Sequence, residues 1–390
     1  MTVTQEQKQL LQSTANVLKD NGKDIMSKFY AALFKEQPEY RNYFNQTNQE
    51  TGKQPEAMAE TIYQFIQYLD NLDAMKPQMS RLSSKHRAVG VKPELYPTLG
   101  KYLIGAITQA LGSKATPEVV AAWNALYSQM ASTFIEREKK LYAELGDSDA
   151  DKGFVPFTIT KKDSIANGPT YLVTLERQGG GKLWNYTPGQ YITIRIEKNG
   201  VQHQGHYTLV EPSNGKNYTI AFKQGKKTDQ NIIVNDEIAS NRQVGGTVLV
   251  SGPAGSFGAV DGAKSNLFIG GGIGIASLMA IINQLVQQNK ASSISVVQCV
   301  RAQGDAAFGE QLKKQLPQGQ YVLLTEKETI AKSYLDGKVN ADTQVYISGS
   351  EAFLALVQKA LAGFNLPKSQ IHIKSIEPTL GLLKAIDAKP

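Results

Sequence analysis

The hydrophobic period changes twice along this chain, and these changes limit the folds open to it. Through residues 1–145 apolar side chains recur three and four positions apart, as at Leu10, Leu11, Val17 and Leu18, which is the spacing of amphipathic helices. Short β-branched and aromatic runs then follow as far as residue 262. From residue 265 strand-like and helical stretches alternate. A chain of 390 residues is long enough for two or three domains, and the pattern predicts three.

The first part is predicted to be all-helical, with about seven helices. Asn21-Gly22 is expected to end the first helix, and Pro55 stands at a favoured N-terminal position of a later one. Gly90 is expected to end the helix KPQMSRLSSKHRA, and Thr116 to cap the start of the last helix.

The later parts differ in how their strands should pair. Six short runs within about 100 residues predict an antiparallel β-barrel. The alternation after residue 265 predicts an α/β domain with βαβ units. Between helices and barrel, the polar and acidic segment Gly146–Gly153 is expected to be a linker. The expected boundaries are therefore 1–145, 146–153, 154–262 and 263–390.

The number of cysteines and the length of the apolar runs exclude several classes of protein. Cys299 is the only cysteine, so neither an internal disulfide nor a zinc site built on cysteines is possible, which fits a reducing compartment. The N-terminal residues show no signal peptide, and no run of about 18 apolar residues predicts a membrane span. We therefore expect a cytoplasmic protein.

The net charge of +7 is concentrated in one part of the chain. Residues 1–150 carry 17 basic and 17 acidic side chains, so the whole surplus lies in residues 151–390, which also hold 27 of the 34 glycines. A basic, glycine-rich segment binds anions or is simply a solvated surface, and charge alone leaves both open. No long basic run with interleaved aromatic residues indicates nucleic-acid binding.

His86 is the only histidine in the first 150 residues. A lone histidine on a helix is more often an ordinary residue than an iron ligand, and its neighbours decide between the two readings. Together with stretches such as FYAALF and FIEREKKLY, and with the three-part layout, the pattern resembles the flavohaemoglobins of bacteria and yeast. The residues that carry the resemblance in the helical part are Phe29-Tyr30, Phe44, Gln54, Met58, His86, Tyr96 and Glu138.

The resemblance implies a globin domain that binds haem b. His86 would be the proximal iron ligand, and Tyr96 with Glu138 would hydrogen-bond its other ring nitrogen. Tyr30 would donate to O2 on the distal side, with Gln54 as a second donor.

Three further residues would shape the same pocket. Met58 would form its wall, where the family usually has leucine, and Phe44 would pack on the macrocycle. Lys85, next to the ligand, would tune the haem potential electrostatically.

The flavin signatures of the family are partly kept. Tyr191, in Pro-Gly-Gln-Tyr, would pack on the flavin nucleotide of FAD. The Arg-x-Tyr-Ser/Thr signature is Gly205-His206-Tyr207-Thr208, so the arginine that meets the pyrophosphate is missing. Its charge would have to come from elsewhere. The candidates are Lys223, Lys226, Lys227 and Arg242, and the family's second phosphate loop corresponds to Val234-Asn235.

The nicotinamide signatures are further altered. A glycine turn follows a predicted strand and opens a helix, as in dinucleotide sites. The residues expected around NAD(P)H are Gly271, Gly272, Ile273, Gly274, Ile275, Ala276, Ser348, Gly349, Ser375 and Ile376. Ile376 replaces a phenylalanine that covers the flavin in the family, and Lys374 replaces a carboxylate near the hydride path.

The resemblance implies a nitric oxide dioxygenase in which NAD(P)H reduces FAD, FAD reduces haem, and O2 with nitric oxide gives nitrate. We expect a monomer without nucleic-acid partners. Two alternatives stay open: an oxidoreductase with a donor other than NAD(P)H, and an O2- or nitric oxide-binding globin whose reductase half is degenerate.

Overall fold

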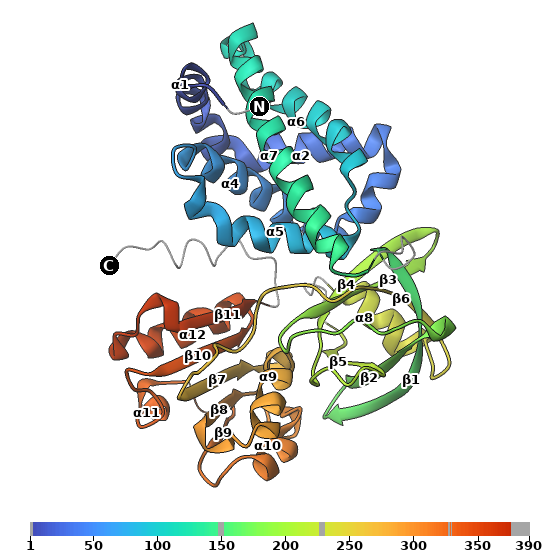
Figure 1. The fold of residues 1–390 in the computed structure, drawn as a ribbon, viewed down its shortest axis with the longest axis vertical. Coiled ribbons are helices and arrows are strands. Elements are labelled where there is room, and N and C mark those ends of the chain that lie inside the picture. Colours follow the sequence, from blue (N-terminus) through green and yellow to red (C-terminus); the bar gives the residue numbers. More distant parts are fainter. Residues whose placement is uncertain (1–2, 147–151, 226–230, 327, 329, 376–390) are drawn as a thin grey trace. The chain divides into compact units, whose positions relative to one another are not determined.

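The computed structural model describes residues 3–146, 152–225, 231–326, 328 and 330–375. The chain forms two compact units: residues 1–154 with 197–204, and residues 155–196 with 205–390 (Figure 1). The expected four-part division at 145, 153 and 262 remains a prediction. In the described ranges, no helix is both long and apolar enough to cross a membrane.

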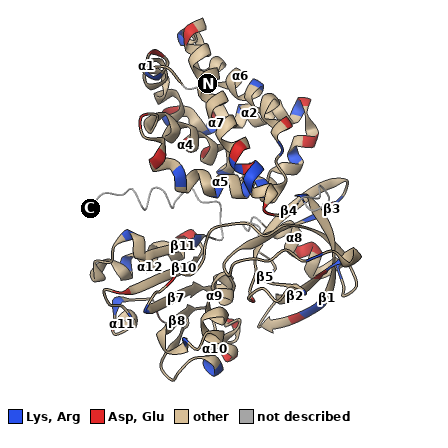
Figure 2. Cartoon of the chain, in the orientation of Figure 1, with Lys and Arg blue, Asp and Glu red and all other residues tan. Residues whose placement is uncertain are grey.

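The first unit is built from helices, as its apolar period predicts. Basic and acidic side chains are interspersed over them (Figure 2), in keeping with their equal numbers. Thr116 caps α7 by accepting from the N–H of Val119, and Gly90, with φ of 85°, ends α5. The α-helices are α1 (Gln5–Thr14), α2 (Asn16–Glu36), α3 (Gln46–Glu50), α4 (Lys53–Gln67), α5 (Lys76–Val89), α6 (Tyr96–Leu111) and α7 (Pro117–Ala143).

The expected break at Asn21-Gly22 is wrong. The chain turns at Ala15 instead, and Gly22 lies inside α2, where a Cβ atom would come within 2.6 Å of the Cβ of Ala59 on α4. The missing side chain lets α2 and α4 pack closely, and this packing outweighs the low helix propensity of glycine.

An antiparallel sheet follows, as the short runs predict, with the strand order β4-β3-β6-β1-β2-β5. A bridge between Leu209, just after β4, and Ile220 of β5 joins the two edge strands. The short helix α8 (Ile232–Asp236) lies between β5 and β6. The strands are β1 (Phe154–Ala166), β2 (Thr170–Arg177), β3 (Tyr191–Lys198), β4 (Val201–Thr208), β5 (Tyr218–Lys223) and β6 (Thr247–Ser251).

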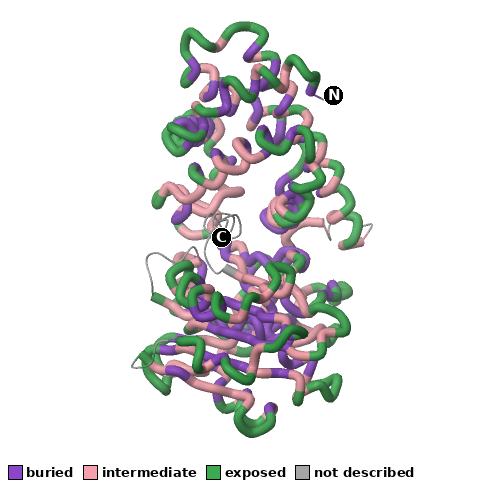
Figure 3. Tube along the Cα trace, turned by 90° about the vertical axis from the view of Figure 1, so that its left-hand side faces the viewer, coloured by how far each residue is buried: buried purple, intermediate pink, exposed green. Residues whose placement is uncertain are grey.

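The last part is a parallel sheet with the order β11-β10-β7-β8-β9, in keeping with the predicted βαβ pattern. Buried positions gather on β7, β8 and β10, whereas β9 and β11 are mostly of intermediate burial; Figure 3 colours the chain by this burial. Its strands are β7 (Ser265–Gly271), β8 (Ile294–Cys299), β9 (Tyr321–Leu324), β10 (Thr343–Gly349) and β11 (Ile371–Ser375). Its helices are α9 (Ala276–Gln287), α10 (Gly309–Gln315), α11 (Lys332–Leu335) and α12 (Glu351–Leu361).

Replacing Gly22 tests the contact between α2 and α4. Gly22→Ala should lower the opening free energy of both helices, because overpacking costs about 1–3 kcal/mol while the helix-propensity gain is about 1 kcal/mol. Gly105→Ala in α6 is the matched control, since no atom lies within 4 Å of its Cβ position. Amide hydrogen exchange measures both, and unchanged or greater protection in Gly22→Ala would contradict the packing argument.

Candidate functional site

Three helices of the first unit meet at one buried carboxylate. Glu138 of α7 is 1% exposed, and its Oε1 lies 2.7 Å from Nδ1 of His86 on α5. The hydroxyl of Tyr96, at the start of α6, donates to the same oxygen at 2.7 Å and lies 3.1 Å from Nδ1. The fold therefore brings together the three residues predicted for the proximal side.

These contacts favour the tautomer of His86 with its proton on Nδ1, because an ionised carboxylate can only accept. Nε2 makes no hydrogen bond to any described residue. Burial, followed by the charge of Glu138, raises the pKa of Tyr96, so the phenol stays protonated and keeps donating. An imidazole whose second nitrogen is held by a carboxylate is oriented and made more basic as a metal ligand.

The same helix α7 fixes the positions of its neighbours. Tyr142, one turn after Glu138, donates to the carbonyl oxygen of Val91 just beyond α5 at 2.8 Å. Tyr127 donates to the carbonyl oxygen of Tyr96 at 2.5 Å. The side chains that hold His86 are therefore anchored through the backbone as well.

A second cluster surrounds the phenol of Tyr30 in α2. Its hydroxyl donates to Sδ of Met58 on α4 at 3.2 Å, and the ring of Phe44 stands edge-on with 5.1 Å between centroids. Burial raises the pKa of Tyr30, although the side chains of Gln54 and Gln49 act in the opposite direction. The phenol is therefore a protonated donor at neutral pH, and its acceptor is a thioether, which accepts weakly.

Gln49 is a residue of this cluster that the sequence did not reveal. It lies in α3, a short helix within a segment whose composition predicts a polar loop. Its Nε2 is buried without a hydrogen-bond partner among the described residues, and its side chain acts against the raised pKa of the Tyr30 phenol. One glutamine in a polar segment carries no signal of its own, so Gln49 joins Gln54 as a candidate second donor only through the fold.

Lys85 precedes His86 on α5 and is half-buried. Burial, with a smaller contribution from Arg81, lowers the pKa of Lys85 to about 8. Its predicted influence on a haem potential remains a prediction.

The two clusters are linked by α4, which carries Gln54 and Met58 near one end and Phe65 nearer the other. The ring of Phe65 lies 6.1 Å from that of Phe134, which in turn lies 5.3 Å from His86. A free imidazole nitrogen, a buried phenol donor and aromatic walls are what haem requires of a globin-like pocket. The residues present therefore fit a haem.

In the antiparallel sheet, Tyr191 opens β3 and packs edge-on against His206, with 5.4 Å between ring centroids. Nδ1 of His206 lies 2.9 Å from Oγ1 of Thr193, and Asn231 bonds to both the N–H and the carbonyl of His206. Both residues are half-buried.

Tyr207 is 3% exposed and donates to Oδ1 of Asn235 at 2.8 Å. A Cβ atom on Gly205 would lie 2.7 Å from the phenol oxygen, so Tyr207 fills the space that a longer side chain at Gly205 would enter. The N–H of Asn235 donates to the carbonyl of Asn231 and is therefore used within α8. The glycine at position 205, where the family signature has arginine, and the buried position of Tyr207 thus belong to one packing arrangement.

The other predicted flavin residues lie nearby. Thr208 donates to Oγ of Ser277 at 3.3 Å, which joins the end of β4 to the start of α9. Val234 is 1% exposed in α8. Lys226 and Lys227, named as substitutes for the arginine, lie outside the described residues. The side chains present thus match a flavin site in part, and they depart from it at Gly205.

The glycine turn after β7 is shaped by close packing. A Cβ on Gly270 would lie 2.8 Å from Ile275, and one on Gly274 would lie 2.5 Å from the carbonyl oxygen of Ser348. Gly272 has a φ of 54° and no atom within 4 Å of its Cβ position. A dinucleotide pyrophosphate needs a tight turn, close packing and an accessible backbone. These glycines allow all three, so the turn fits a pyrophosphate.

The remaining predicted nucleotide residues border this turn. Gly271 and Gly349 both face the ring of Phe353, where a Cβ atom would overlap it. Ile273 is half-buried, and Ala276 begins α9. Ser375 is the last residue of β11, and Ile376 lies outside the described residues.

Gly270, Ser348 and Lys374 lie in register at the carboxyl ends of β7, β10 and β11. The ammonium of Lys374 lies 4.8 Å from the ring centroid of Tyr191 and 5.7 Å from that of Phe257. Burial lowers the pKa of Lys374 to about 8. Oγ of Ser348 is buried without a partner among the described residues. A cation and a free hydroxyl therefore border this edge of the parallel sheet.

Removing the charge of Glu138 tests the proximal arrangement. Glu138→Gln should raise the haem midpoint potential, because a less basic histidine stabilises the ferric state less. A tenfold change in the equilibrium corresponds to about 59 mV for one electron, and we expect a shift of at least this size. Glu144→Gln, an exposed position just after α7, is the control. Spectroelectrochemical titration measures the haem midpoint potential of each variant. Equal potentials in Glu138→Gln and Glu144→Gln would contradict the assignment.

Comparisons with known proteins agree with this arrangement. Residues 27–134 match the globin family. The chain is 30% identical to a flavohemoprotein of Halalkalibacterium halodurans over 97% of both chains. It is 31% identical to flavohemoprotein A of Dictyostelium discoideum, over 97% of this chain and 99% of that one.

Solved structures give the same result. A flavohemoglobin of Malassezia yamatoensis, determined with bound FAD and heme, matches with a TM-score of 0.85 and 25% identity over 96% of this chain and 99% of that one. The helical first unit, the antiparallel sheet and the parallel sheet are thus a globin fold followed by a ferredoxin reductase-like pair. The chain belongs to the flavohemoprotein family, the flavohaemoglobins.

Proposed function

We propose that this protein is a haem- and FAD-dependent oxidoreductase that uses NAD(P)H and O2 to oxidise nitric oxide to nitrate. The observation that carries the proposal is the contact of Glu138 with both His86 and Tyr96, in a chain that matches flavohemoproteins over almost its whole length. The Malassezia yamatoensis flavohemoglobin binds FAD and heme, which supports the same cofactors here.

The residues described above would hold these groups. His86 would bind the haem iron through Nε2, Tyr191 and His206 would face the flavin, and the turn around Gly272 would receive the nicotinamide dinucleotide. When bound, the flavin passes electrons from hydride to haem, and haem supplies the site at which O2 and nitric oxide react.

On the proximal side, Oε1 of Glu138 accepts hydrogen bonds from Nδ1 of His86 and the hydroxyl of Tyr96. Through Nδ1 this carboxylate would increase the electron density that His86 offers to the haem iron. Tyr96 fixes the carboxylate in this position, and its raised pKa keeps the phenol proton in place.

Tyr30 acts on the distal side as a proton donor in a hydrogen bond. Its bond to Met58 is weak, so turning the hydroxyl toward a polarised oxygen atom costs little and gains a stronger acceptor. Gln54 would be a second distal donor, and Gln49, whose Nε2 has no partner among the described residues, would serve in the same way.

A second candidate function differs only in the electron donor. Lys374 places an ammonium beside Tyr191 where family members carry a carboxylate, and Gly205 lacks the arginine. Both departures lie on the reductase half, so they favour an oxidoreductase that accepts electrons from a donor other than NAD(P)H.

Tyr30→Phe tests the distal donor. Losing one hydrogen bond to a polarised acceptor should raise the O2 dissociation rate of the ferrous protein about 10- to 100-fold. Met58→Leu should lower this rate slightly, since the phenol loses a competing acceptor. Tyr63→Phe, a half-buried tyrosine of α4, is the control. Laser flash photolysis measures the rates.

The raised pKa of Tyr30 also predicts how the O2 dissociation rate should respond to pH. A phenol with a pKa above its usual value of about 10 stays protonated at neutral and mildly alkaline pH, so the wild-type rate should stay flat between about pH 6 and 9. A rate that rises toward the Tyr30→Phe value within this range would contradict distal donation by a protonated Tyr30.

The stoichiometry of the complete reaction tests the proposed activity. Two nitric oxide molecules, two O2 and one NAD(P)H should give two nitrate ions, one NAD(P)+ and one proton. Nitrate yield and NADH or NADPH consumption are measured together after mixing with nitric oxide in air, and His86→Ala should abolish nitrate formation. Flavin reduced only by another donor, such as a small hydroxy acid, would replace the first candidate with the second.

A further inference from the structure

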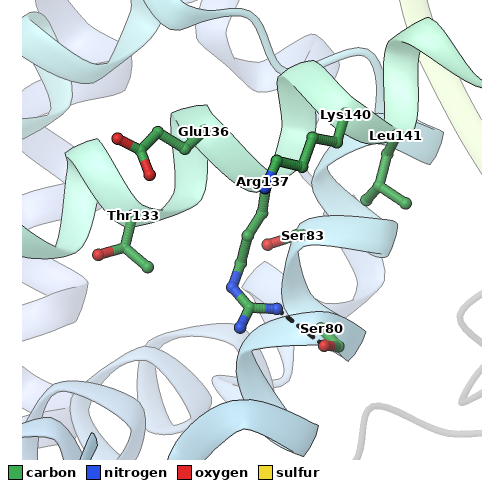
Figure 4. Close-up of a pocket in the computed structure, with 7 residues that line it drawn as sticks. All are labelled: Ser80, Ser83, Thr133, Glu136, Arg137, Lys140 and Leu141. Atoms are coloured by element: carbon green, nitrogen blue, oxygen red, sulfur yellow. Dashed lines mark hydrogen bonds between the residues drawn. The ribbon is translucent and has the colours of Figure 1, made fainter.

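A pocket lies between α5 and α7, apart from the residues assigned above to haem, flavin and nucleotide. Its volume is about 500 Å³, within the range of small-molecule sites. Figure 4 shows side chains from both helices around it. Ser80 and Ser83 belong to α5, and Thr133, Glu136, Arg137 and Lys140 belong to α7.

Hydrogen-bond donors exceed acceptors in this pocket. Arg137 reaches from α7 to α5, where Nη1 donates to Oγ of Ser80 at 2.9 Å (Figure 4). Among the described residues, neither Arg137 nor Lys140 forms an ion pair. The hydroxyl of Thr133 is already used, since it donates to the carbonyl of Gln129 at 2.8 Å.

The hydroxyl of Ser83 supports a ligand site independently of the charged side chains. The residue is fully buried in α5, lines the pocket, and its Oγ has no hydrogen-bond partner among the described residues. A buried hydroxyl without a partner destabilises the fold, and such groups in native proteins usually meet a ligand, ion or water. A ligand with several acceptor oxygens would satisfy it.

The charge balance indicates the sign of that ligand. Two cations, Arg137 and Lys140, stand against one carboxylate, Glu136, whose side chain points away from Arg137 in Figure 4. A guanidinium with free N–H groups suits planar or tetrahedral oxyanions. We propose that this pocket binds a phosphate-type oxyanion, held by Arg137 and Lys140 with Ser83 as the buried donor.

The position of the pocket couples it to the proximal side. Ser83 lies one turn before His86 on α5, and Arg137 directly precedes Glu138 on α7. Ferric haem carries one positive charge more than ferrous haem, so an anion bound here should bind the ferric form more tightly. By linkage, the same anion should lower the haem midpoint potential.

The test is a titration of the full-length, haem- and FAD-loaded protein with inorganic phosphate by calorimetry, with sodium chloride holding the ionic strength constant. Saturable binding should weaken at least about tenfold in Arg137→Gln and severalfold in Lys140→Gln and Ser83→Ala. Glu136→Gln should strengthen it, because a repelling charge is removed. Lys139→Gln, an exposed neighbour outside the pocket, is the matched control and should bind as the wild type does.

Phosphate affinities that are the same in all these variants would overturn the site. A loss in Lys139→Gln equal to that in Arg137→Gln would also do so, since it would show a general charge effect. Comparing the affinities of glycerol 3-phosphate and inorganic phosphate shows whether the site prefers a phosphomonoester or the free ion. Glycerol alone should not bind. Repeating the titration on ferric and ferrous protein tests the coupling, which equal affinities would refute.

Discussion

The carboxylate of Glu138 is buried among three helices, and the arrangement of the globin unit depends on how its charge is satisfied. A buried carboxylate is stable only when paired and hydrogen-bonded, and here His86 and Tyr96 both serve its Oε1. Because each partner lies on a different helix, this one oxygen joins α5, α6 and α7. The result leaves Nε2 of His86 as the one ring nitrogen free to bind iron.

The reductase half depends on close packing rather than on one charge. Gly270 and Gly274 let the turn after β7 approach Ile275 and the end of β10, and Gly205 gives room to the phenol of Tyr207. The glycine at position 205, which looks like a loss in the sequence, is therefore accommodated by the neighbouring Tyr207. The ammonium of Lys374 lies over the ring of Tyr191 and places a positive charge at this edge of the parallel sheet.

Periodicity predicted the elements and their order, because helices and strands place side chains at fixed intervals, whereas the proximal residues followed from the resemblance to flavohaemoglobins. The prediction was wrong at Gly22, where a contact with α4 overrides local propensity. Gln49 and Ser83 could not be found in advance, since neither residue type signals burial without a partner. The orientation of Tyr207 depends on the space left at Gly205, which is a property of packing and not of the motif.

In the proposed function, one chain carries electrons from a nicotinamide through flavin to a haem held by His86. The most direct measurement is the absorption spectrum of the purified full-length protein before and after anaerobic addition of NADH or NADPH. The flavin absorbance should bleach and the haem should convert to its ferrous form. A haem that stays ferric with both nicotinamides, yet is reduced by dithionite, would contradict it.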